Sequence, residues 1–146
     1  MAERTKQVVI TVTGLQRDAQ GEENRIELVS TGEYVRKNGV GYIKYRETEL
    51  SGLEGTTTVI KVRADEVTLL RMGKVEQKQV FRPGQKTQSL YTTPFGNLDM
   101  AVVTGVLHIS ETAGAGELPA IYIEYELEIA GDWQSANTLS ITLRED

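Results

Sequence analysis

The segment IYIEYELEI, residues 121–129, places an apolar or aromatic side chain at every second position. Successive side chains of a strand point to opposite faces of a sheet, so this period predicts a strand with one buried face. Ile121, Ile123 and Tyr125 are expected on the inward side. The same alternation recurs around Leu139–Leu143 and in the first strand, at Lys6–Gln16. These segments indicate an all-β protein.

Turn signals separate the alternating segments at short and fairly even intervals. Asn38-Gly39 is the strongest, because this pair is typical of a type I′ hairpin turn. The nine signals are Gln20-Gly21, Asn38-Gly39, Ser51–Gly55, Ala64-Asp65, Gly73-Lys74, Pro83-Gly84, Pro94–Gly96, Gly114–Gly116 and Gly131-Asp132. Strands at such spacing, without a helical pattern among them, are typical of a barrel or a sandwich.

About ten strands are predicted, each paired with its neighbours in the chain. Those before the last cover residues 6–16, 25–37, 40–48, 56–63, 66–72, 75–81, 86–92, 98–111 and 121–129. Gly32 is expected to mark a bulge or a sharp bend, and Gly105 a bend. With an even number of strands, the first and the last can pair and remove the exposed edges. We therefore predict a closed antiparallel meander β-barrel of about 8–10 strands, as one domain over residues 1–146, in preference to an open sandwich.

Composition and charge exclude several classes of protein. Charged residues make up 25% and hydrophobic residues 39%, which is ordinary for a soluble globular protein. The net charge of −5 argues against nucleic acid or an anionic membrane surface as a partner. Since there is no cysteine, disulfides and zinc–thiolate sites are excluded. The chain begins without a signal-peptide pattern, so a cytoplasmic location is expected.

Familiar catalytic motifs are absent from the sequence. His108 is the one histidine, and simple alternation places it on the face of Val102, Thr104 and Val106, as a structural residue. There is no Gly-x-Ser-x-Gly motif and no phosphate-binding loop. We therefore predict no catalytic residue, no cofactor and no metal site.

Among the carboxylates, Glu47 differs from the rest. Glu124, Glu126 and Glu128 lie opposite an apolar face and are expected to be solvated. Glu47 instead shares its face with Ile43 and Tyr45, so an apolar face ends there in a charge.

Strand direction groups Glu47 with three other residues. If consecutive strands alternate in direction, Tyr45, Glu47, Arg71 and Tyr91 meet at one end of the barrel. Barrel mouths are where ligands bind in small barrels. An Arg–Glu pair there would alternatively satisfy buried polar groups and plug the interior. Both interpretations remain open at this point.

Several short motifs, in a fixed order, resemble a known family. They are Ser30–Tyr34, Tyr45–Glu49, Lys61-Val62, Arg71–Gly73, Phe81–Gly84 and Tyr91–Gly96. Together they are similar to the YwiB-like family of bacterial domains of unknown function, over about residues 7–143. The resemblance implies a calycin-like barrel, similar to lipocalins, and no established activity, substrate or cofactor.

Three functional hypotheses follow. The first is a non-enzymatic barrel that binds a small anionic or amphipathic molecule through Tyr45, Glu47, Arg71 and Tyr91. The second is a structural or protein-interaction barrel with a filled interior, in which exposed Tyr122, Trp133 or Phe95 form a patch, as in a homodimer. An enzyme acting through Glu47 is the third.

Overall fold

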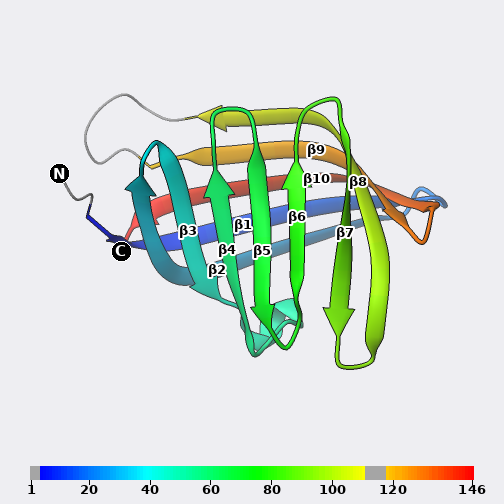
Figure 1. Ribbon diagram of the computed structural model, residues 1–146, viewed down its shortest axis with the longest axis horizontal. Coiled ribbons are helices and arrows are strands. Elements are labelled where there is room, and N and C mark those ends of the chain that lie inside the picture. The colour runs from blue at the N-terminus through cyan, green and yellow to red at the C-terminus, as the bar shows by residue number, and fades with distance from the viewer. Residues whose placement is uncertain (1–3, 111–117) are drawn as a thin grey trace.

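The computed structural model describes residues 4–110 and 118–146, which form ten strands and one 3₁₀ turn (Figure 1). The strands are β1 (Lys6–Asp18), β2 (Glu23–Lys37), β3 (Val40–Arg46), β4 (Thr56–Val62), β5 (Val67–Gly73), β6 (Gln77–Phe81), β7 (Lys86–Thr93), β8 (Gly96–Ser110), β9 (Ala120–Ile129) and β10 (Asp132–Glu145). The turn, η1, covers Glu49–Ser51. The predicted turn at Gly114–Gly116 and the predicted strand end at Glu111 lie outside the described residues. The predicted number of strands is confirmed.

All ten strands belong to one antiparallel sheet in the order β6-β5-β4-β3-β2-β1-β10-β9-β8-β7. The first and last strands pair from Val8↔Glu145 to Asp18↔Ser135, as predicted. In Figure 1, β3 to β7 stand upright in front, and β1, β2, β9 and β10 run across behind them. β8 rises at the right and then turns along the top, joining the two layers. The result is a nearly closed all-β barrel.

The prediction that all consecutive strands pair is wrong at one place, between β6 and β7. These strands end the sheet, and among the described residues a single backbone bridge, Glu76↔Thr92, joins their edges. The amide of Gly84 donates to Thr104 O (2.8 Å), and the amide of Thr104 donates to Gln85 O (3.2 Å). The connection thus extends the ladder of β7 with β8 and leads β7 away from β6. We call this gap the β6–β7 seam.

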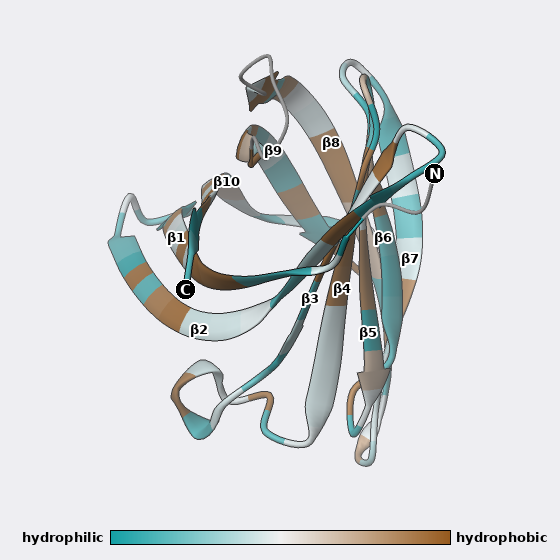
Figure 2. Cartoon of the chain, turned by 90° about the vertical axis from the view of Figure 1, so that its left-hand side faces the viewer, coloured by the Kyte–Doolittle hydropathy of each residue, from teal (hydrophilic) through white to brown (hydrophobic). Residues whose placement is uncertain are grey.

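Alternation along the strands builds the core. The apolar cluster contains Ile10, Ile43, Ile60, Ile123 and Ile141, each no more than 2% exposed. In Figure 2, brown and teal bands alternate along β2 and β9, as a half-buried strand requires. The predicted inward positions of β9 are confirmed, since Ile121 and Ile123 are buried and Tyr125 packs against the cluster.

Gly32 produces a bend without a bulge. The register of β2 with β1 runs through Gly32 without a shift, and the ladder of β2 with β3 begins at Gly32↔Tyr45. A Cβ there would lie 2.8 Å from Ile10 Cδ1 and 2.9 Å from Tyr45 Cβ, and would overlap the carbonyl oxygen of Lys44. β2 curves strongly from the rear layer to the front one in Figure 1. Glycine is needed because β3 approaches closely.

Gly105 lies in a β-bulge, which overturns the predicted environment of His108. The register of β8 with β9 shifts between Thr104 and Val106. The extra residue reverses the faces, so Leu107 packs against the core while Val106 and His108 are exposed. His108 therefore does not share the buried face of Thr104.

The turn at Asn38-Gly39 has the predicted geometry. The φ angles of Asn38 (51°) and Gly39 (79°) are both positive, as a type I′ turn requires. Among the described residues, no helix has the length and apolar character needed to cross a membrane.

Candidate functional site

Strand direction brings the predicted residues to the same end of the barrel. β3, β5 and β7 all finish at the lower end in Figure 1, where η1 and the β7–β8 turn also lie. Tyr45 pairs with Thr58, Thr58 with Arg71, and Arg71 with Gln77. Directly opposite residues share a face, so these four side chains form one inward row across four strands.

Tyr45, Glu47 and Thr58 form a buried polar group. Tyr45 is 9% exposed and Glu47 is 8% exposed. The hydroxyl of Thr58 donates a hydrogen bond to Oε2 of Glu47. The backbone amide of Glu47 donates to Thr56 O (2.9 Å), which extends the β3–β4 ladder past the strand end. Burial, and then the nearby Glu47 carboxylate, raise the pKa of Tyr45 far above its usual value, while Arg71 opposes the shift.

Arg71 is a partly buried cation with a neutral partner. Its Nη1 donates to Oε1 of Gln77 over 2.7 Å. Its Nε is buried and has no hydrogen-bond partner. No ion pair links Arg71 to Glu47, or to any other carboxylate of residues 4–110 and 118–146. The Arg–Glu plug considered from the sequence is therefore not formed within this part of the chain.

The polar row continues across the β6–β7 seam through side chains that the sequence analysis did not select. Nε2 of Gln77 donates to Oγ of Ser89 (3.1 Å), and Ser89 Oγ donates to Oε1 of Gln79 (2.8 Å). Nε2 of Gln79 donates to Oγ1 of Thr87 (3.1 Å). The sequence pattern could have indicated the two glutamines. Gln77, Gln79 and Phe81 occupy every second position of β6 and therefore share its buried face.

Tyr91 lies on the inward face of β7, two positions beyond Ser89, and is partly exposed. Its strand partner is Leu98, which also faces inward and remains 45% exposed. Within the described residues, no hydrogen bond joins Tyr91 to Tyr45, Glu47 or Arg71. The structure therefore brings Tyr45, Glu47 and Arg71 to one region of β3 to β5. Tyr91 lies on β7, across the β6–β7 seam.

Inward-facing residues are fully buried at some positions and partly exposed at others. Val8, Ile43 and Ile121 are fully buried, while Ile109 and Leu143, which pair with Ile121 and Ile10, keep partial exposure. In the half of the barrel that includes Arg71, several inward-facing residues are partly exposed. They are Val12, Leu28, Leu69, Arg71, Ser89, Tyr91, Met100, Leu127 and Leu139. Solvent therefore reaches a mainly apolar inner surface that borders Arg71.

The described residues contain no group of three or more His, Asp or Glu side chains able to hold a metal ion. The chemistry that the site does offer is a cation, a buried phenol, a carboxylate and two amides. Such groups recognise anions and hydrogen-bonding ligands.

Comparisons with known proteins match nearly the whole barrel. The model of the domain of unknown function DUF1934 matches residues 10–141, which run from β1 to β10. The chain belongs to the DUF1934 family. A curated relative of this DUF1934 chain is the uncharacterized beta-barrel protein YwiB of Bacillus subtilis (strain 168). The two are 28% identical over 122 residues, which cover 84% of this chain and 82% of the relative.

A solved structure is similar to this DUF1934 barrel throughout. The crystal structure of the ywiB protein from Bacillus subtilis has a TM-score of 0.84 and 26% sequence identity. The match covers 99% of this chain and 96% of that chain. The family resemblance noted from the sequence is thus confirmed. The DUF1934 description assigns no activity, so function must be argued from the residues.

Proposed function

We propose that this DUF1934 β-barrel binds a small, anionic, amphipathic molecule at the Arg71 end of its interior. One observation carries the proposal. Arg71 faces inward with only the neutral amide of Gln77 as a hydrogen-bond partner in the described chain, and its Nε is unpartnered. A buried cation without a counter-charge is costly, and a bound carboxylate or phosphate would remove that cost.

The neighbouring inner surface suits an apolar tail. Leu69 lies beside Arg71 on the same face of β5, and Leu127, Leu139 and Met100 are partly exposed inward residues of other strands in the same half. Burying such a tail contributes about 0.8 kcal/mol per methylene group. The hydroxyls of Tyr45 and Tyr91 would supply hydrogen bonds or apolar ring surface beside the head group. Small closed barrels such as lipocalins have room for one small ligand.

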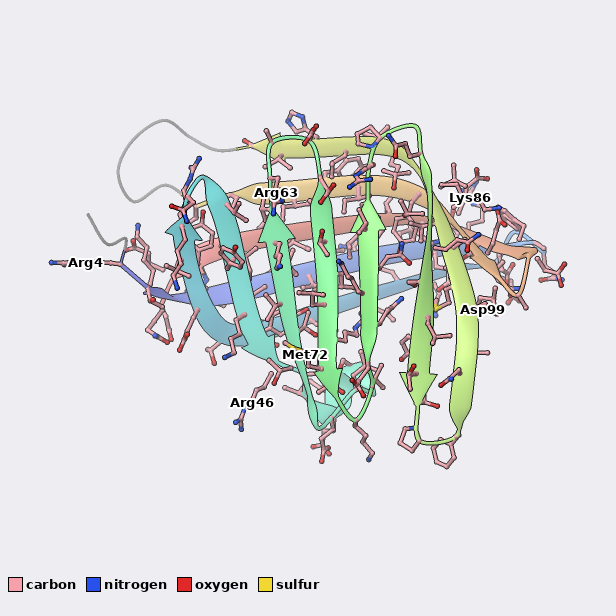
Figure 3. All side chains as sticks on the ribbon, viewed as in Figure 1. Arg4, Arg46, Arg63, Met72, Lys86 and Asp99 are labelled. Carbon is pink, nitrogen blue, oxygen red and sulfur yellow. The ribbon has the colours of Figure 1, made fainter. Side chains whose placement is uncertain are left out.

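Binding can be tested with three probes that share a twelve-carbon chain: dodecanoate, neutral dodecanol and cationic dodecyltrimethylammonium, all below their micelle concentrations. Isothermal titration calorimetry should give saturable binding for dodecanoate and weaker binding for the other two. Arg71→Gln should weaken dodecanoate about tenfold and leave dodecanol unchanged, since only the charge contact is lost. Arg46→Gln is the matched control, because Arg46 lies at the same end and points away from the barrel (Figure 3).

Native mass spectrometry of the purified protein is an independent measurement. A co-purifying mass that Arg71→Gln loses and Arg46→Gln retains would support the proposal. Equal affinity for all three probes, or equal effects of the two substitutions, would contradict it. Thermal unfolding of each variant verifies that the barrel remains folded.

A further inference from the structure

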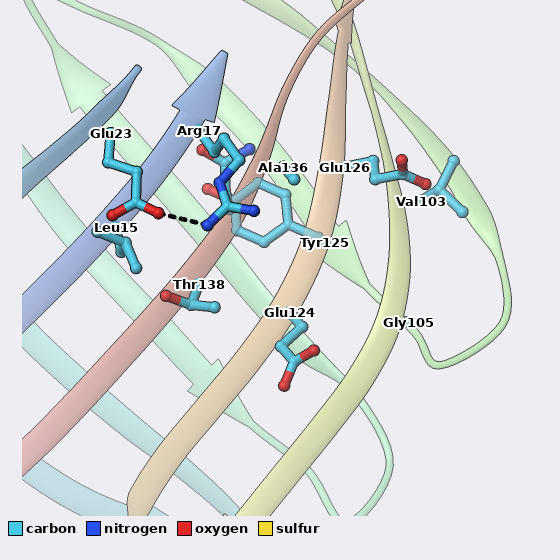
Figure 4. A pocket seen from close by; sticks show the side chains of 11 residues that line it. Leu15, Arg17, Glu23, Val103, Gly105, Glu124, Tyr125, Glu126, Ala136 and Thr138 are labelled. Atoms are coloured by element: carbon cyan, nitrogen blue, oxygen red, sulfur yellow. Dashed lines mark hydrogen bonds and ion pairs between the residues drawn. The ribbon is translucent and has the colours of Figure 1, made fainter. Parts of the chain in front are cut away.

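A concave site lies on the outer face of the barrel, away from Arg71 (Figure 4). It is a groove of about 400 Å³ that crosses β1, β10, β9 and β8. Its lining includes Leu15, Ala136, Thr138, Val103 and Gly105, which give it a mainly apolar floor. These side chains point outward, because the inward positions of the same strands belong to the core cluster.

Small side chains explain why the sheet is hollowed here. Thr138 pairs with Glu124, and Ala136 pairs with Glu126. Gly105, at the bulge of β8, adds no side chain beside them. Larger residues follow on both sides along the strands, with Tyr122 (37% exposed) on one side and Trp133 (43% exposed) on the other. The groove is therefore bordered by two aromatic side chains.

Two glutamates on the groove are held in place and lack a counter-ion. The hydroxyl of Tyr122 donates to Oε2 of Glu124 (2.7 Å), and Nε1 of Trp133 donates to Oε1 of Glu126 (3.1 Å). In the described part of the chain neither carboxylate has a cationic partner. Arg17 and Glu23, which also line the groove, pair with each other, and Glu128, outside the groove, pairs with Lys86. The remaining charge of the groove is therefore that of Glu124 and Glu126.

We propose that this groove binds an extended segment of a partner protein that presents lysine or arginine next to aliphatic side chains. Charge complementarity carries the choice: Glu124 and Glu126 supply two unneutralised charges above an apolar floor. Aliphatic side chains of the segment lie on Leu15 and Val103, and a basic side chain places its charged head between the glutamates. The rings of Tyr122 and Trp133 add cation–π attraction.

The dimensions favour a peptide segment over a small molecule. Four neighbouring strands span about 15 Å, which matches four to five residues of extended chain. Small-ligand sites enclose most of the ligand surface, whereas this groove lies open on the outer face of a sheet. A protein segment needs no such enclosure, because its flanking residues add contacts outside the groove.

Trp133 is the only tryptophan of the chain, so its fluorescence reports directly on the groove. The probes are two capped pentapeptides, Leu-Lys-Leu-Lys-Leu and Leu-Glu-Leu-Glu-Leu. The lysine peptide should give a saturable change in Trp133 emission that weakens in about 0.5 M salt, and the glutamate peptide should give none. Glu124→Gln with Glu126→Gln should weaken the lysine peptide at least about tenfold. Glutamine still accepts the aromatic hydrogen bonds, so the aromatic border is kept.

A matched double variant removes the same charge elsewhere. Glu33→Gln with Glu54→Gln should bind the lysine peptide as the unmodified protein does, since both residues are exposed and lie outside the groove. Calorimetry repeats the titration without relying on fluorescence. Equal binding of both peptides, or equal affinity of both double variants, would overturn the proposal. A dimer of the unmodified protein that Glu124→Gln with Glu126→Gln dissolves would also overturn it, in favour of a second copy of this chain.

Discussion

Arg71 donates from Nη1 to Oε1 of Gln77 over 2.7 Å, so the inward cation of β5 is held by a neutral amide of β6. The two residues are direct cross-strand partners. A carboxylate at position 77 would therefore pair with the guanidinium without moving either strand. A glutamate introduced at position 77 would thus neutralise the charge of Arg71 without any bound ligand.

We predict that Gln77→Glu weakens anion binding while the barrel stays folded. The new carboxylate would compete with dodecanoate for Arg71 and weaken dodecanoate about tenfold, as Arg71→Gln should. Gln88→Glu adds the same charge on the exposed face of β7 and should leave the affinity unchanged. Calorimetry of both variants provides the measurement. Unchanged affinity in Gln77→Glu would show that the ligand head group does not contact Arg71.

Alkaline pH should destabilise the barrel through Tyr45. Its pKa is raised in the folded state, mainly by burial, so above about pH 10 the unfolded chain loses a proton that the folded chain retains. Stability is therefore full below about pH 10, and above it the free energy of unfolding falls by about 1.4 kcal/mol per pH unit for this group. Tyr125, whose pKa burial also raises, adds to the slope. Urea unfolding from about pH 8 to 11.5 should give a shallower decline in Tyr45→Phe. Parallel pH profiles of the two proteins would exclude Tyr45 as the source.

The β6–β7 seam should depend on Ser89. Ser89→Ala removes the acceptor of the Gln77 amide and the donor to Gln79 with little loss of volume. We expect a loss of about 1–2 kcal/mol in the free energy of unfolding, because Gln77 and Gln79 are both buried. Ser140→Ala, on the outward face of β10, should change it by less than about 0.5 kcal/mol. Hydrogen exchange should also accelerate in β6 and β7. If the two variants unfold alike, the side chains of the seam do not hold it closed.

Two glycines of neighbouring strands should respond in opposite ways to alanine. A methyl group at Gly32 would overlap the Lys44 carbonyl and crowd Ile10 and Tyr45, so Gly32→Ala should cost roughly 3 kcal/mol or prevent folding. At Gly14 nothing lies within 4 Å of an added Cβ. Gly14→Ala should therefore gain about 0.5–1 kcal/mol, because alanine loses less conformational freedom on folding. Urea unfolding of the two variants tests both signs. Similar stabilities would contradict the close approach of β3.

The sequence sufficed for the features that depend on periodicity. Alternation at Ile121–Ile129 predicted the inward face of β9, and the even strand number predicted the β1–β10 pairing. Strand direction alone brought Glu47 and Arg71 to one end. These predictions succeeded because they depend on local chemistry and on simple counting.

The sequence-based predictions failed where one extra residue or a tertiary contact determines the structure. His108 was assigned to the wrong face, because an alternation count does not reveal the bulge at Gly105. The β6–β7 seam was not predicted, because Pro83-Gly84 resembles every other turn signal. In the structure, the backbone hydrogen bonds that follow this turn are made with Thr104 of β8. Gln77 and Ser89 were not selected because the hydrogen bonds that join Ser89 to β6 cross the seam, between strands that do not pair along the backbone. The sequence does not show whether Tyr122, Trp133 and Phe95 lie close enough to form one patch. In the structure, Tyr122 and Trp133 border the outer groove, and Phe95 lies at the β7–β8 turn.

The position of the seam also determines how the chain could be rearranged. In spatial order the sheet starts at β7, passes through β10 and β1, and ends at β6. β1 and β10 are neighbours inside this order, and the amide of Asp146 donates to Gln7 O (3.1 Å). The sequence is therefore a circular permutation of a simple ten-strand meander. A gene that joins the end of β10 to the start of β1 by a short linker and opens the chain between Pro83 and Gly84 would encode that meander with all its strand pairs intact.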